Sequence, residues 1–162
     1  MAGMRGPIPI LALAAILSSA CGPTVDLSTG LQVLDPVSGW HDAGLSNGQN
    51  KLVPRITFTV KNVSDQRLGS LQANVVFRHG DDTEDWGSAF LTVAGSDGLA
   101  PDASRGPLVA TSTLGYTGLE PRAEMLQNSQ FVDARVEIFA KYASTQWVKV
   151  AEYPIERRLL AP

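Results

Sequence analysis

The chain has 162 residues, 13 basic and 16 acidic side chains, and a formal net charge of −3. This length is typical of a single domain, and its 44% apolar residues suffice for a packed core, which excludes a wholly disordered chain. A nucleic-acid binder needs a clustered basic surface, so the acidic balance predicts no nucleic-acid partner. One cysteine excludes an intrachain disulfide and a cysteine-cluster zinc site.

Residues 1–20 have the composition of a secretory signal peptide. Arg5 is followed by an apolar run over 8–17 and then by small residues. A basic start, about 7–15 apolar residues and small residues before a cleavage site are typical of an export signal. The apolar run is shorter than the ~20 helical residues that span a bilayer. We therefore expect a cleaved signal rather than a transmembrane anchor.

The single cysteine directly follows this signal. The run Leu17-Ser18-Ser19-Ala20-Cys21 resembles the lipobox of bacterial lipoproteins, with Ser18 at the position that usually holds Leu. The resemblance implies that Cys21 becomes the first mature residue and carries acyl chains. Several chains together give a stable anchor, because each buried methylene contributes ~0.8 kcal/mol. The alternative is an ordinary secretory signal that contains a chance cysteine.

The same resemblance bears on localisation. Gly22 after the cysteine implies the outer membrane, facing the periplasm, if the cell is Gram-negative. Cleavage removes Arg5 and no acid, which leaves 12 basic and 16 acidic side chains and a net charge of −4. Because no polybasic segment attracts anionic lipids, the membrane is expected as a partner only through lipid on Cys21. Residues 21–30 are expected to form the lipidated tether and residues 31–162 the folded domain.

Period-two alternation predicts strands through the mature chain. It is clearest over 55–61, which Pro54 is expected to begin, and over 132–141. Turn-forming residues separate further expected strands at 31–34, 71–77, 86–93, 107–114 and 147–153. About seven short strands, with one helical turn after Pro121, predict an all-β, immunoglobulin-like two-sheet β-sandwich. A partly closed barrel is the alternative.

Two segments resemble the FxLYD-type immunoglobulin-like modules of bacterial surface proteins. The run from Ile56 to Ser64 contains a V-x-N sequence at the end of a strand, and the apolar strand 71–77 follows it. The run Leu99-Ala100-Pro101-Asp102-Ala103-Ser104 is similar to their L-x-P-G-x-S turn, with Asp102 where glycine is usual. The resemblance covers about half of the mature chain. It implies a binding or spacer module without a catalytic residue.

The histidines are the candidate catalytic bases. The sequence has no nucleophile elbow, zinc-protease motif, P-loop or dinucleotide fingerprint. His41 and His79 each lie beside acids, and Ser38 could complete a triad on paper. A triad also needs a buried orienting acid and an oxyanion hole, and the sequence signals neither. We expect both histidines to be solvated loop residues and the protein not to be an enzyme.

Two loops are candidate ligand sites. An acidic loop could supply carboxylates to Ca²⁺, although its spacing is not that of an EF-hand and a solvated turn is favoured; its residues are Asp81, Asp82, Glu84 and Asp85. Trp40 and His41 lie in a predicted Gly/Asn/Ser-rich loop that continues to Asn50. Trp40 could be a ligand platform, but a plug at one end of the sandwich is favoured. The pattern Asn62-Val63-Ser64 fits N-glycosylation, which has no default meaning in a bacterial lipoprotein.

The sequence supports a lipid-anchored envelope protein with a non-enzymatic β-sandwich for binding, interaction or spacing. An envelope protein is its expected partner, and no cofactor is expected. The alternative is an exported domain that binds a small ligand or calcium. A hydrolase using one of the two histidines ranks third.

Overall fold

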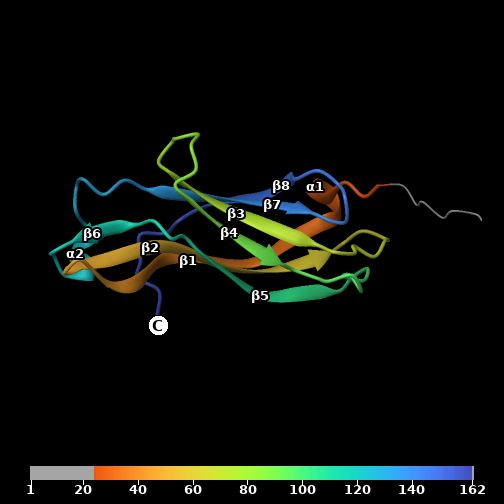
Figure 1. Cartoon of the computed structure of the whole chain (residues 1–162), viewed down its shortest axis with the longest axis horizontal. Coiled ribbons are helices and arrows are strands. Elements are labelled where there is room, and N and C mark those ends of the chain that lie inside the picture. The colour runs from red at the N-terminus through yellow and green to blue at the C-terminus, as the bar shows by residue number, and fades with distance from the viewer. Residues whose placement is uncertain (1–23, 162) are drawn as a thin grey trace, which may run out of the picture.

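The computed structural model describes residues 24–161. Two antiparallel sheets lie one above the other as a two-sheet β-sandwich, as predicted, and do not close into a barrel (Figure 1). The elements in chain order are α1 (Leu27–Gly30), β1 (Leu31–Ser46), β2 (Gln49–Asn62), β3 (Gln72–His79), β4 (Gly87–Thr92), β5 (Ser104–Thr111), β6 (Tyr116–Gly118), α2 (Arg122–Met125), β7 (Ala134–Lys141) and β8 (Val148–Pro154).

The strand order places β2 and the β3–β7 pair at the centre of their sheets. One sheet has the order β1-β2-β5, with β6 also paired to β2, and the other has the order β4-β3-β7-β8. Alternate side chains of these strands point between the sheets. Phe58, Phe77 and Ile138 are each no more than 1% exposed. The alternation in the sequence therefore identifies the core face correctly.

The first hairpin is much longer than the sequence suggested. The expected loop over 40–50 is instead the second half of β1, a tight turn at Asn47-Gly48 and the start of β2. Both turn residues have positive φ, 51° at Asn47 and 77° at Gly48, which is the requirement of a type I′ turn. An Asn-Gly pair between alternating residues is a strong hairpin signal, and it was available in the sequence.

Pro54 lies inside β2 rather than at its start. β2 pairs with β5 from Arg55 onwards and with β6 up to Leu52. Pro54 therefore occupies the gap between two partners, where its carbonyl accepts a hydrogen bond from the Ser112 amide at 3.0 Å. A proline lacks the ladder N–H, and at this changeover no partner strand needs that donor.

A β-bulge reverses the alternation of inward and outward side chains along β8. Strict alternation along the strand would place Tyr153 on the face opposite Val148, but both side chains pack against the core. The register shifts between Ile138 and Phe139 of β7, so β8 has one extra residue there. An extra residue reverses the side-chain alternation beyond it, which brings Tyr153 to the inner face.

The folded domain begins before the expected boundary at residue 31. Leu27 is 1% exposed and belongs to the core, and Asp26 caps α1 by accepting from the Ser28 amide at 2.9 Å. The Val25 amide donates to the Tyr142 hydroxyl at 2.7 Å. Of the expected tether over 21–30, the described residues are thus fixed to the sandwich.

Asn62 links the loop that follows β2 to the loop that precedes β5. Its side chain is fully buried and donates to the carbonyls of Gln66 at 2.8 Å and Leu99 at 2.9 Å. Its Oδ1 accepts from the amide and the hydroxyl of Ser64, at 3.0 and 2.6 Å. The asparagine of the Asn-Val-Ser pattern is therefore a buried link between two loops.

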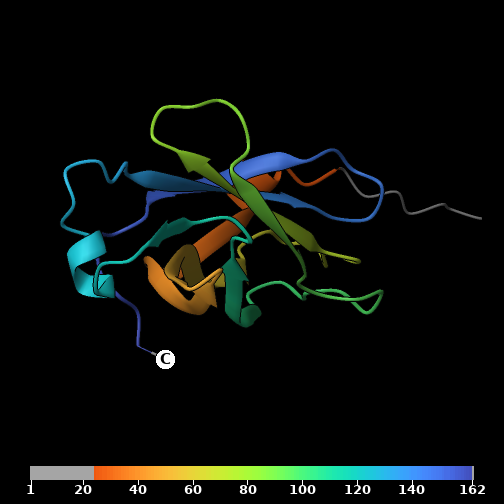
Figure 2. The same ribbon diagram turned by 60° about the vertical axis from the view of Figure 1, so that its left-hand side comes forward.

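The two ends of the long axis carry different parts of the chain (Figures 1 and 2). At the entry end, α1 begins the described fold. At the far end lie α2, β6 and the turn between β1 and β2. Among the described residues, no helix has the length and apolar character needed to cross a membrane.

Candidate functional site

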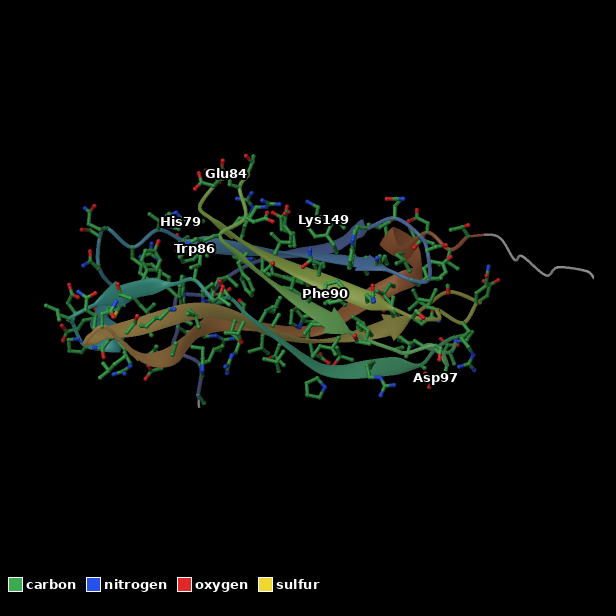
Figure 3. The ribbon with its side chains drawn as sticks, viewed as in Figure 1. His79, Glu84, Trp86, Phe90, Asp97 and Lys149 are labelled. Atoms are coloured by element: carbon green, nitrogen blue, oxygen red, sulfur yellow. The ribbon has the colours of Figure 1, made fainter. Side chains whose placement is uncertain are left out.

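A cluster of five rings fills the sandwich toward the far end. Trp40 is 0% exposed, and its ring centroid lies 4.7 Å from Phe131, 5.5 Å from Tyr116 and 6.1 Å from Trp86. His79 completes the cluster, with its ring centroid 5.0 Å from that of Trp86. Figure 3 shows His79 and Trp86 at the base of the loop between β3 and β4. Trp40 therefore fills the interior of the sandwich, the role that the sequence favoured, and it is too buried to present its ring to a ligand.

The hydroxyl of Tyr116 ties three segments together. It hydrogen-bonds to Nε2 of His79, donates to the Val132 carbonyl at 2.9 Å and accepts from the Val132 amide at 3.0 Å. Burial raises the pKa of Tyr116, so the hydroxyl stays protonated at neutral pH. The same side chain thus positions β6, the end of β3 and the segment before β7.

A small open hollow of about 160 Å³ lies beside this cluster at the far end. Rings and a thioether form its apolar part, and a carboxylate, two amides and a hydroxyl form its polar part. The lining residues are Tyr116, Thr117, Gly118, Glu120, Met125, Asn128, Gln130 and Phe131. No histidine, lysine, arginine or cysteine is among these lining residues, so the hollow holds no nucleophile–base pair of the usual kind.

The wall that α2 supplies is held by polar contacts. Arg122 Nε forms an ion pair with Asp42 Oδ2 of β1 at 2.5 Å, and this nearby guanidinium lowers the pKa of Asp42. The side-chain amide of Asn50 donates to the Glu120 carbonyl at 2.8 Å. On the other side, the guanidinium of Arg157 lies 5.2 Å from the Phe131 ring centroid. The hollow is therefore largely preformed, as ligand sites usually are.

Neither histidine is the solvated loop residue that was expected, because both lie on strands. His41 is in β1, and its Nδ1 is buried with no hydrogen-bond partner among residues 24–161. Burial, helped by the charge of Arg55, lowers the pKa of His41. Ser38 is 5% exposed and donates to the Pro154 carbonyl at 2.8 Å, so its hydroxyl is used in joining the two sheets.

The acidic loop between β3 and β4 projects from the sandwich with Glu84 at its tip (Figure 3). Two arginines hold its base. Arg135 donates to the carbonyls of Gly80 and Asp82, and Arg78 donates to the Thr83 carbonyl and forms an ion pair with Asp85 at 2.8 Å.

The contacts of this loop bear directly on the calcium hypothesis. Ca²⁺ binds carboxylates together with backbone carbonyls, and here guanidinium groups already occupy three of the carbonyls. Among residues 24–161, no three Asp, Glu, His or Cys side chains are grouped closely enough to hold a metal ion. Asp81, Asp82, Glu84 and Asp85 thus lie on one loop without forming a coordination shell.

The sequence did not predict the hollow, because its residues come from the irregular stretch over 115–131. Only three of those residues form a strand, β6, and that is too short for alternation to be visible. The signal peptide at 1–20 and Cys21 lie outside the described residues, so the structure does not bear on them.

Comparisons with known proteins give no family. No family model and no curated protein matches the chain. Northeast Structural Genomics Consortium target SoR45 has a TM-score of 0.42 and 12% identity, over 80% of this chain and 89% of that one. A GH20 exo β-N-acetylglucosaminidase from Vibrio harveyi, solved with N-acetylglucosamine, has a TM-score of 0.28 and 14% identity, over 78% of this chain and 19% of the enzyme. At these TM-scores neither likeness supports an argument about function.

Proposed function

We propose that this chain is a membrane-anchored envelope lipoprotein whose β-sandwich is a non-enzymatic binding module. Cys21 carries the lipid, and the hollow at the far end receives the partner. One observation carries the proposal: the described chain enters the sandwich at one end, and β6 and α2, which supply residues that line the hollow, lie at the other (Figure 1). An anchor at the entry end leaves the hollow facing away from the membrane.

The short connection to Cys21 supports this orientation. Val25 is already tied to Tyr142, and Leu27 is already in the core. Four residue steps from Cys21 to Val25 span at most ~14 Å. The entry end of the domain therefore stays near the membrane surface, and the sandwich itself serves as the spacer.

Exposed leucines at the far end support a protein partner. Leu119 follows β6 directly and is 79% exposed, and Leu45 near the β1–β2 turn is 71% exposed. Exposed apolar side chains gathered near a preformed hollow are typical of interaction sites. The lining of the hollow favours binding over catalysis, because its one carboxylate, Glu120, has no basic partner among the lining side chains.

The test uses full-length protein in its own membrane. Mass spectrometry is expected to find an N-terminal peptide that begins at acylated Cys21, and Cys21→Ser is expected to abolish that acylation and membrane retention. A photo-crosslinking residue at position 119 is expected to give a discrete adduct. The matched control is the same residue at Val63, which is 43% exposed and lies in the loop after β2, away from the hollow.

Filling the hollow provides the second arm. A Cβ added at Gly118 would lie 2.6 Å from the end of the flexible Glu120 side chain and 3.3 Å from Met125 Cε. Gly118→Val is therefore expected to fill the hollow and remove the adduct from position 119 without unfolding the domain. An unacylated N-terminus would refute the anchor, and an adduct that survives Gly118→Val in the folded protein would refute the hollow as the binding site.

A further inference from the structure

The outer face of the β4-β3-β7-β8 sheet, which points away from the other sheet, carries two exposed rings. Phe90 of β4, labelled in Figure 3, is 59% exposed, and Trp147, directly before β8, is 38% exposed. Their centroids lie 5.8 Å apart, and their planes are nearly perpendicular at 83°. We call Phe90 and Trp147 the aromatic pair. Ala89 and Leu91 on either side of Phe90 pack against the core, which confirms that Phe90 points outward.

Strand pairing places free polar side chains beside the aromatic pair. Asn74 of β3 lies directly opposite Phe90 on one side and Phe139 of β7 on the other. In the next outward-facing row, Gln72 lies between Thr92 and Lys141. Within residues 24–161, the side-chain amides of Asn74 and Gln72 make no hydrogen bond. Donors and acceptors are thus available within one strand spacing of the rings.

The charge beside the aromatic pair is positive. The ammonium group of Lys141 lies 5.0 Å from the Trp147 ring centroid, and it forms no ion pair with any described residue. The carboxylates of this face are already neutralised. Glu137 lies 2.6 Å from Arg78 and 3.4 Å from Lys149, which in turn lies 2.9 Å from Glu152.

We propose that the aromatic pair, with Asn74, Gln72 and Lys141, binds an acidic glycan, a polysaccharide strand that carries carboxylate groups. The apolar C–H face of a sugar ring can pack flat against an aromatic ring, which gives van der Waals contact over the shared area. Its hydroxyls match the free amides, and its carboxylate matches the ammonium of Lys141 by a charge-assisted hydrogen bond. This site is separate from the hollow and does not depend on lipid at Cys21.

The size of the patch argues against a protein partner on this face. A stable protein interface takes ~800 Å² from each side, with an apolar core. A large aromatic side chain buries about 150–250 Å² in full, so two partly exposed rings offer on the order of 200 Å². The free amide of Asn74 lies directly opposite Phe90. A narrow amphipathic strand fits this arrangement better than a second protein surface.

Calorimetric titration of full-length protein in detergent tests the inference with two matched hexasaccharides. Hexagalacturonate, which is acidic, is expected to bind at least about tenfold more tightly than neutral cellohexaose, because only the acidic strand can pair with Lys141. Lys141→Gln is expected to remove that preference, and Phe90→Ala and Trp147→Ala each to weaken binding about tenfold through lost stacking. Added salt is expected to weaken binding of the acidic strand.

Two far-end variants serve as controls. Leu119→Ala removes an apolar side chain that is 79% exposed, more than either ring of the aromatic pair, and Lys51→Gln removes an ammonium that donates to the Thr113 carbonyl at 2.9 Å. Both are expected to bind hexagalacturonate like the wild type. Phe90 lies outside the core, so a thermal melt is expected to show Phe90→Ala folded.

Four outcomes would overturn the inference. They are an absence of binding to either hexasaccharide at millimolar concentration, equal binding of both, unchanged binding by folded Phe90→Ala, and binding to anionic lipid vesicles but to neither sugar. The last outcome would assign the face to lipid headgroups instead. None of these outcomes affects the acylation of Cys21 or the adduct at the hollow.

Discussion

Replacing Asn62 by alanine is expected to destabilise the domain strongly. The side chain is 0% exposed, and its amide makes four hydrogen bonds, two as donor and two as acceptor. Alanine removes all four and leaves the carbonyls of Gln66 and Leu99 without these donors. The loop after β2 and the loop before β5 would then lose the side chain that links them.

The magnitude follows from the number of bonds. A typical internal hydrogen bond contributes about 0.5–1.5 kcal/mol net, so four bonds give roughly 2–6 kcal/mol. Ser64 and Gln66 are partly exposed and can turn to water, so the lower half of that range applies. We expect a loss of about 3 kcal/mol out of a total that is ~5–15 kcal/mol for a domain. The midpoint of thermal unfolding should fall by roughly 10 °C.

Urea denaturation followed by tryptophan fluorescence measures this loss. Ser64→Ala is the matched control, because it removes only the hydroxyl contacts, and it should cost no more than about 1 kcal/mol. Asn62→Asp keeps the acceptors and loses both donors, so its loss should be comparable to that of alanine. If Asn62→Ala costs less than about 1 kcal/mol, the two loops do not depend on this side chain and the reasoning fails.

Three further variants test the polar groups. Burial, with the charge of Arg55, lowers the pKa of His41. The contribution of neutral His41 to the free energy of unfolding is therefore fully present above the ordinary histidine pKa of about 6.5 and is lost as pH falls below it. His41→Gln should consequently lose less stability than the wild type between pH 7 and pH 5. Urea midpoints that fall in parallel for the two proteins would contradict this. Although burial opposes it, the hydrogen bond and charge of Arg78 lower the pKa of Glu137. Glu137→Gln should thus lower the free energy of unfolding by about 2 kcal/mol at pH 7. The difference in stability between the wild type and this variant should narrow as pH falls through the carboxyl pKa, and a difference that stays constant with pH would argue against the ion pair. Tyr116→Phe removes the hydroxyl at the centre of the aromatic cluster and should lower the free energy of unfolding, measured by urea denaturation, by about 1–3 kcal/mol. An unchanged free energy of unfolding would mean that water replaces the hydrogen bonds of the hydroxyl.

Alternation in the sequence predicted the sandwich because it is a local property. Residues two apart on a strand share a face whatever the strand pairs with, so the inward side chains of β2, β3 and β7 could be assigned from the chain alone. The same rule places Phe90 on the outer face, because Ala89 and Leu91 on either side of it pack against the core. It failed at Tyr153, where one extra residue in β8 reversed the alternation and no local pattern marks the bulge.

The sequence by itself determined the class of fold and the position of the core strands, and it predicts an anchor at Cys21. Only the tertiary structure decided which side chains meet. The aromatic cluster takes Trp40, His79, Trp86, Tyr116 and Phe131 from segments far apart in the chain, and the aromatic pair joins β4 to the residue before β8. Such contacts depend on which strands pair and in what register, and register is set by the whole sandwich rather than by any one segment.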